Sequence, residues 1–168
     1  MSSDRLRQVE KHLQILREQQ GSVEREILLT TGIHKIQAEQ RLRLEIKPKL
    51  IQFETEYWQI LANESETVAI AEPAPEVVVA EIVEQVRQLQ ISQQYSDEVL
   101  EWLQKIYIEV SKPGVPAAAK LKGALSLLPP FVSLSYEAEL DTENFLRTHF
   151  PTFTKWYKVV AKNLPKKS

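Results

Sequence analysis

The sequence predicts an all-α fold, in which a long antiparallel helical hairpin is followed by a small helical bundle with at most one short strand or strand pair. Apolar residues recur every three or four positions in two long segments, residues 3–30 and 42–62, as they do on one face of a helix. Only 4 of the 168 residues are glycine, which disfavours tight turns between strands. Alternation of apolar and polar residues is confined to residues 131–140.

The first helix is expected over residues 3–30. Its apolar residues follow the three-four spacing of a coiled-coil seam, while the other faces carry Arg, Lys, Glu and Gln. Gln20 at a seam position and the adjacent Gly21 weaken the middle of this helix. A narrow apolar stripe is unfavourable in water, so the helix needs a partner helix. The expected seam residues of the first helix are Leu6, Val9, Leu13, Leu16, Val23 and Ile27.

The second helix is expected to follow a break at Thr30-Thr31-Gly32 and to end near Ala62. Pro48 lacks a backbone N–H, so it should kink or divide this helix near residues 44–47. A break this short can only return the chain antiparallel, which places the two stripes face to face. The expected seam residues of the second helix are Ile46, Leu50, Phe53, Tyr57 and Ile60, with Leu42 one turn earlier.

Composition divides the chain into three parts. Residues 1–63 form the hairpin, residues 64–76 form an acidic linker containing prolines, and residues 77–168 form a compact bundle with a basic C-terminal helix. Ser96 before two acidic residues and Asp141 are good helix starts, because their side chains accept unpaired backbone N–H groups. The helices expected in the bundle cover residues 77–94, 97–110, 117–128, 141–149 and 151–164.

Residues 131–140 are the expected strand or extended connector, because Val132, Leu134 and Tyr136 alternate with polar residues. Pro129 and Pro130 precede the segment and end the helix before it. Such a strand either pairs with residues 77–79 or adds to the sheet of a partner.

Charge is unevenly distributed although the net charge is only −2. Residues 64–114 hold 3 Lys and Arg against 10 Asp and Glu, whereas residues 115–168 hold 8 against 4. The basic end is either a solvated face that attracts the acidic middle or a docking surface for an acidic partner, nucleic acid or anionic lipid. The possible docking residues are Lys155, Lys158, Lys162, Lys166 and Lys167.

Catalytic and metal-binding motifs are missing from the sequence. It contains no cysteine, which excludes disulfides, zinc-thiolate sites and thiol nucleophiles. The three histidines, His12, His34 and His149, lack metal-site spacing, and the match of Thr152 and Lys155 to a Ser/Thr-x-x-Lys pattern is a common coincidence. We therefore expect no metal, no cofactor and no enzymatic activity. The absence of a secretory signal and of any run of 18 apolar residues predicts a cytoplasmic protein.

Two segments resemble parts of known proteins. Residues 13–61 are LQILREQQGSVEREILLTTGIHKIQAEQRLRLEIKPKLIQFETEYWQIL, and residues 120–160 are KLKGALSLLPPFVSLSYEAELDTENFLRTHFPTFTKWYKVV. They resemble the helical-hairpin, effector-associated or death-like adaptor modules of cyanobacterial signalling proteins, which precede NACHT-type ATPases, caspase-like proteases, TIR domains or pentapeptide repeats. Since no such domain follows in this sequence, the resemblance implies a free-standing adaptor or regulator that pairs with a separate effector chain.

The expected function is non-catalytic protein–protein interaction in a signalling or defence assembly, with a separate effector chain or a second copy as the partner. Three alternatives remain open. A membrane-acting effector would insert residues 115–134 and use the basic C-terminal helix. A nucleic-acid-binding accessory protein would use residues 155–167, and a hydrolase would need a pocket lined by convergent ionisable groups.

Overall fold

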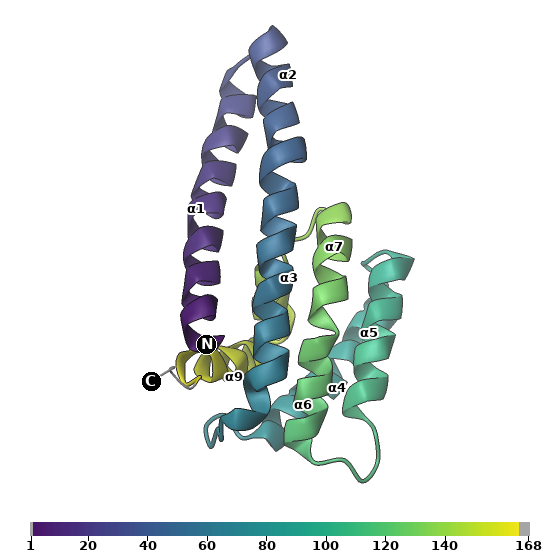
Figure 1. Cartoon of the computed structure of the whole chain (residues 1–168). Helices are drawn as coiled ribbons and strands as arrows, with labels where there is room; N and C mark the ends of the chain where they lie inside the picture. The colour runs from purple at the N-terminus through teal and green to yellow at the C-terminus, as the bar shows by residue number, and fades with distance from the viewer. Residues whose placement is uncertain (1, 165–168) are drawn as a thin grey trace.

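The hairpin extends beyond the rest of the protein in this computed structural model, which describes residues 2–164 (Figure 1). Helix α1 (Ser2–Leu29) forms one arm, and α2 (Gly32–Arg41), the π-helical turn η1 (Leu42–Ile46) and α3 (Lys47–Glu64) form the other. Gly32 makes the turn possible with φ of +67°, a conformation that other residues rarely adopt. The expected antiparallel hairpin is therefore present.

The π-helical turn ends two residues before Pro48, where the sequence predicts a disturbance of the helix. Proline removes one backbone donor and its ring crowds the preceding turn, so the hydrogen-bonding pattern widens there. The helix continues past this turn, and Figure 1 shows the second arm as one rod. Pro48 thus alters the helix locally and does not divide the arm into separate pieces.

The segment after the hairpin lies against the bundle. The short 3₁₀ helix η2 (Ser65–Thr67) follows α3 directly, and the Ser65 side chain is buried. Val68 and Ile70 are half-buried and pack on the main core. Residues expected as an acidic linker therefore contribute apolar contacts to the core.

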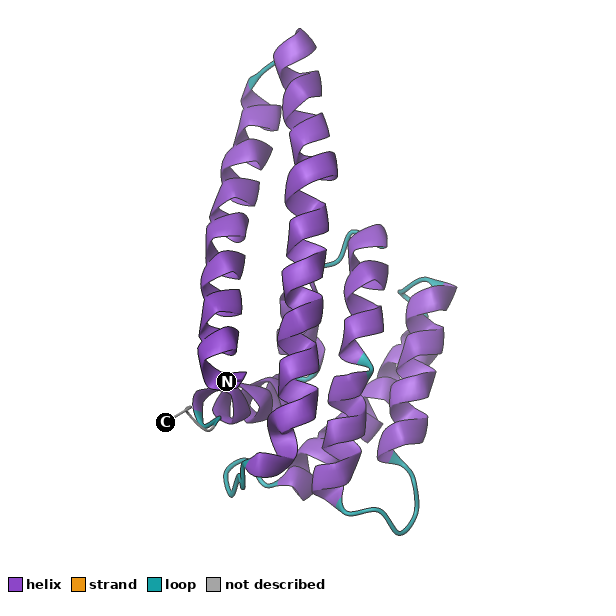
Figure 2. Cartoon of the chain, viewed as in Figure 1, coloured by secondary structure: helices purple, strands orange, loops and turns teal. Residues whose placement is uncertain are grey.

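The bundle consists of α4 (Pro75–Ser92), α5 (Asp97–Val110), α6 (Ala117–Ser126), α7 (Leu128–Glu137), α8 (Thr142–His149) and α9 (Pro151–Lys162). Both predicted helix starts are confirmed. The Ser96 side chain accepts the Val99 N–H at 3.4 Å, and the Asp141 carboxylate accepts the Asn144 N–H at 3.2 Å. Every regular element among residues 2–164 is helical, as Figure 2 shows, and the all-α prediction is confirmed.

The strand expected at residues 131–140 is wrong, because α7 occupies most of this segment. Pro129 and Pro130 lie in the first turn of α7, where a missing N–H costs nothing, so they start a helix. Phe131 and Ser135, one helical turn apart, are both buried, and the Phe131 ring stacks on Trp102 at a centroid distance of 3.9 Å. Tertiary packing outweighs the alternating pattern here.

The main core joins the base of the hairpin to the bundle. Leu6 of α1 and Trp58 and Leu61 of α3 belong to the same buried cluster as Leu103 of α5 and Tyr157 of α9. A second buried cluster runs up the hairpin between its arms. The bundle therefore holds the lower half of the hairpin, while the upper half is stabilised by contacts between its own arms.

Candidate functional site

The predicted seam residues lie between the arms of the hairpin. Val9, Leu13, Leu16, Val23, Ile46 and Leu50 are buried there, and Ile27, Leu42, Phe53, Tyr57 and Ile60 pack against them half-buried. Leu6 instead belongs to the main core. Ala38, which the sequence reasoning did not include, completes the cluster. These side chains close the hairpin and are already covered by its own arms.

The expected basic surface is only partly described. Lys155, Lys158 and Lys162 are exposed on α9, whereas Lys166 and Lys167 lie outside the described residues. Lys158 Nζ lies 3.9 Å from a carboxylate oxygen of Glu143. The aromatic residues of α9 are buried in the core, so they cannot stack on bases or anchor in a lipid interface.

Residues 115–134, the segment expected to insert if the protein acted on membranes, supply the centre of the bundle. Leu121, Leu125, Leu128 and Phe131 are completely buried. Inserting this segment into a bilayer would require the core to open. No helix within residues 2–164 combines the length and the apolar character needed to cross a membrane.

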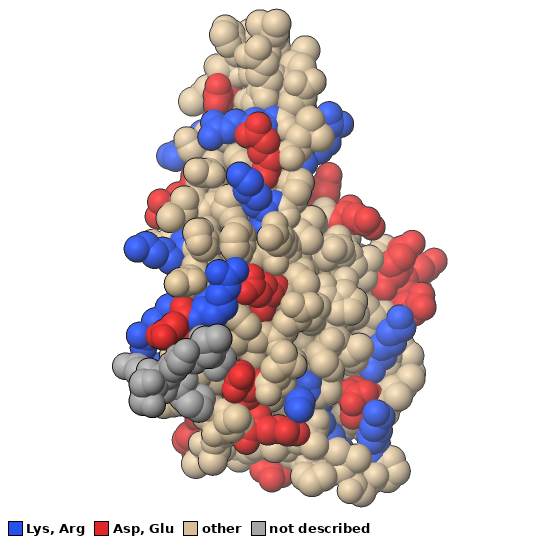
Figure 3. Space-filling model, viewed as in Figure 1, with Lys and Arg blue, Asp and Glu red and all other residues tan. Residues whose placement is uncertain are grey.

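The exposed end of the hairpin carries a concentration of apolar side chains. Leu28, Leu29, Ile33 and Ile36, which we call the tip patch, are between 56% and 84% exposed. On the face seen in Figure 3 this end shows neither acidic nor basic side chains. Clusters of large apolar side chains in water are unfavourable and commonly mark an interaction site. The tip patch is the candidate binding surface.

A run of three apolar residues in the sequence indicates the tip patch, although the seam periodicity does not. Ile27, Leu28 and Leu29 are consecutive, and consecutive helical residues point in different directions. Only Ile27 fits the seam spacing, so its two neighbours must lie off the seam. Because Leu28 and Leu29 lie off the seam and next to the turn, they indicate that the turn end of the hairpin is apolar and exposed.

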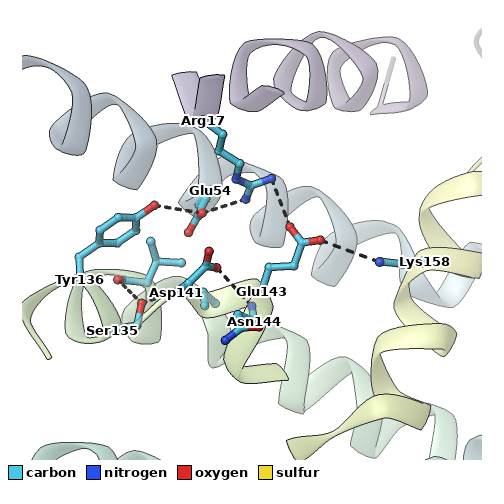
Figure 4. Close-up of polar contacts among 10 residues, drawn as sticks. Arg17, Glu54, Ser135, Tyr136, Asp141, Glu143, Asn144 and Lys158 are labelled. Carbon is cyan, nitrogen blue, oxygen red and sulfur yellow. Dashed lines mark hydrogen bonds and ion pairs between the residues drawn. The ribbon is translucent and has the colours of Figure 1, made fainter. Parts of the chain in front are cut away.

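A cluster of charged residues fixes the hairpin to the bundle (Figure 4). Arg17 of α1 donates a hydrogen bond to Glu54 Oε1 of α3 at 2.9 Å and forms an ion pair with Glu143 Oε2 of α8 at 3.2 Å. The Tyr136 hydroxyl of α7 also donates to Glu54 Oε1, at 3.1 Å. With Lys158 beyond Glu143, the cluster connects five helices. We call these five residues the junction cluster.

Glu54 is the buried member of the junction cluster, with 3% of its surface exposed. Burial raises the pKa of Glu54, against the lowering effect of the hydrogen bonds and charge supplied by Arg17 and Tyr136. Neither Glu54 nor Arg17 was singled out from the sequence. Glu54 nevertheless interrupts the buried stripe Leu50, Trp58 and Leu61, and a charged residue within such a stripe indicates a paired internal charge.

The raised pKa of Glu54 has a measurable consequence for stability. At pH values between the ordinary value of 4.5 and the folded pKa, the folded protein holds a proton that the unfolded chain has released. The free energy contributed by this group therefore falls as the pH rises through that window. We expect the free energy of unfolding of the wild type to fall with rising pH relative to that of Glu54→Gln, measured by urea denaturation at a series of pH values. A difference that is constant or grows with pH would contradict this.

Comparison of the chain with known proteins identifies no relative. No protein-family model, curated protein or solved structure matches the chain significantly. The resemblance to adaptor modules therefore stays a prediction. Within residues 2–164, His, Asp and Glu side chains form no group of three that could hold a metal ion.

Proposed function

We propose that the protein is a non-catalytic interaction module, an adaptor or regulator, which binds its protein partner through the tip patch. The observation that carries the proposal is the gathering of four large apolar side chains at the end of the hairpin, away from the core that buries comparable side chains elsewhere. Complete burial of each such side chain contributes about 1.5–3 kcal/mol. A few contacts of this kind supply most of the free energy of a protein interface.

The construction of the hairpin supports this role. The seam residues hold the arms together, and the junction cluster attaches the lower part of the hairpin to three bundle helices. A surface presented on a rigid support loses little conformational entropy when it binds. The tip patch thus combines apolar area with preorganisation.

The chemistry of the tip patch indicates the kind of partner. Between Ile27 and Ala38 the only ionisable side chains are His34 and Lys35, so the tip contains no acidic residue. Helical side chains of this type insert into an apolar groove of another protein. The groove belongs either to a separate effector chain, as the resemblance implies, or to a second copy of this chain.

Photo-crosslinking in the cell of origin tests the proposal. A photoreactive amino acid in place of Leu29 is expected to form covalent bonds with a specific protein, either a second copy or another chain. The matched control carries the same group at Ile91, an apolar residue of α4 that is also exposed (77%) but lies outside the tip patch. Adding Leu28→Glu to the Leu29 variant should abolish the crosslinks, because a charge in an apolar interface is strongly unfavourable.

Two results would overturn the proposal. Crosslinks that form equally well from Ile91 and from Leu29 would show random collision. Crosslinks from Leu29 to lipid and to no protein would assign the tip patch to a membrane surface.

A further inference from the structure

The second arm of the hairpin carries a line of apolar side chains on the face turned away from α1. Ile33, Ile36 and Leu44 are between 56% and 66% exposed, and Pro48 is exposed as well. These four residues, which we call the outer stripe, follow the three-four spacing of one helical face, with Gln40 between Ile36 and Leu44. The seam residues of this arm lie on its opposite face, where they pack against α1.

The bundle covers the continuation of the outer stripe. The same spacing leads along α3 to Ile51, which packs half-buried on the main core, and to Trp58, which is buried in it. In Figure 1, α7 packs along α3 on the side away from α1, whereas the helix packed along α2 and η1 is α1. The outer stripe is therefore the uncovered part of a face whose lower part already packs against helices.

Charged residues lie along both edges of the outer stripe. Arg41 and Glu45 share one edge and form an ion pair with each other at 3.9 Å. Glu39 and Arg43 share the other edge, and both are exposed. They are four residues apart, a spacing that often allows an ion pair on a helix. Among residues 2–164, however, neither forms an ion pair, so this edge presents one acid and one base to the surroundings.

The order of these charges matches a second copy of the chain. When two identical helices pack antiparallel about a two-fold axis, the same edge of each helix meets and runs in the opposite direction. Glu39 of each copy then lies beside Arg43 of the other, so that all four charges gain a partner. The same register inserts Leu44 of one copy between Ile36 and Gln40 of the other, as knobs-into-holes packing requires.

The width of the outer stripe disfavours a lipid surface as its partner. A helix that lies in a membrane interface has a broad apolar face and a polar face rich in Lys and Arg. The outer stripe is narrow, is interrupted by Gln40 and is bordered by Glu39 and Glu45. Narrow apolar stripes with charges of both signs at their edges are typical of helices that pack on another helix.

We infer that the protein forms a two-fold symmetric dimer in which the outer stripes of two copies pack antiparallel. The inference rests on the proposed function in that Ile33 and Ile36 also belong to the tip patch, and it assigns a second copy as the partner there. Apolar contacts drive the association, while the ion pairs between Glu39 and Arg43 fix its orientation. Because the paired segment is only about four helical turns long, the dimer is weak and reversible.

Sedimentation equilibrium of the full-length protein, from micromolar to millimolar concentrations, tests the dimer. We expect the wild type to change reversibly from monomer to dimer across this range. Leu44→Glu should raise the dissociation constant about tenfold, because it places a carboxylate in the apolar contact. Ile91→Glu on α4 is the matched control and should dimerise like the wild type, since Ile91 is exposed but lies outside the outer stripe. A wild type that stays monomeric, or equal effects of the two substitutions, would overturn the inference.

Reversal of the edge charges tests the orientation of the two copies. Glu39→Arg and Arg43→Glu should each raise the dissociation constant about tenfold, because each places like charges together at two symmetric positions. A mixture of the two variants should form a heterodimer with nearly the affinity of the wild type, because each edge contact again joins an acid and a base. Both residues are exposed, so these variants remain informative if Leu44→Glu fails to fold. A mixture that associates no more tightly than either variant alone would overturn the antiparallel pairing.

The dimer and the proposed function can fail separately. A monomeric wild type whose position 29 still crosslinks to another protein would overturn the dimer and leave the proposed function intact. Dimerisation through the outer stripe, together with crosslinks from position 29 to lipid and to no protein, would overturn the proposed function and support the dimer.

Discussion

Leu13→Glu is expected to lower the free energy of unfolding by about 5 kcal/mol, the largest effect of any single substitution considered for the hairpin. Leu13 lies at the centre of the seam, 4% exposed, against the residues of the opposite arm. The substitution removes the burial of a leucine, worth about 1.5–3 kcal/mol, and places a carboxylate in an apolar environment. Both effects act in the same direction.

Ile15→Glu is the matched control, because Ile15 lies two residues away on the same helix and is 44% exposed. We expect it to change stability by less than about 1 kcal/mol. Urea denaturation followed by circular dichroism gives both values, and light scattering shows whether either variant changes its molecular mass. An unchanged midpoint for Leu13→Glu would contradict a hairpin closed by the seam.

Arg17→Ala is expected to lower the free energy of unfolding by about 3 kcal/mol at neutral pH. The substitution removes the hydrogen-bonded ion pair with Glu54 and the ion pair with Glu143, and it leaves the Glu54 carboxyl group buried with Tyr136 as its remaining partner. Because the Arg17 side chain is 38% exposed, the effect lies at the lower end of the range for breaking a buried ion pair. For a chain of this length the melting temperature should fall by about 6–12 °C.

Arg25→Ala is the control for Arg17→Ala, since Arg25 is an exposed residue of the same helix with no ion pair among the described residues. A double-mutant cycle with Glu54→Gln isolates the coupling between Arg17 and Glu54. The loss caused by Arg17→Ala should shrink as the pH is lowered, because a protonated Glu54 no longer needs its counter-charge. Equal destabilisation by Arg17→Ala and Arg25→Ala would show that the junction cluster does not hold the hairpin.

The sequence predicted the hairpin well because the features that specify a hairpin involve residues close together in the chain. The three-four spacing in residues 3–30 and 42–62, the Thr30-Thr31-Gly32 break and the disturbance before Pro48 each depend on a few neighbouring residues. The helix starts at Ser96 and Asp141 are local in the same sense, and the structure confirms both. The expected strand at residues 131–140 was wrong because alternation over a few residues is compatible with either structure, and packing of Phe131 on Trp102 favours the helix.

The junction cluster could not be predicted from the sequence, because its residues are far apart in the chain. Arg17 and Glu54 are 37 residues apart, and Tyr136 is 82 residues from Glu54. No spacing rule connects them, because their contact arises only when the hairpin docks on the bundle. The adjacent Leu28 and Leu29 could have predicted the tip patch from the sequence. Its exposure, however, depends on how much of the hairpin the bundle covers.

The sequence by itself therefore determined that the chain is helical, where the hairpin turns and most of the residues that close it, since hydrophobic periodicity and helix capping act between near neighbours. Tertiary structure alone decided that Glu54 is buried beside Arg17, that α7 covers only the lower part of the second arm, and that the tip patch remains exposed. Burial is a property of the assembled helices: the same leucine or glutamate lies in water or in the core according to which distant segment covers it.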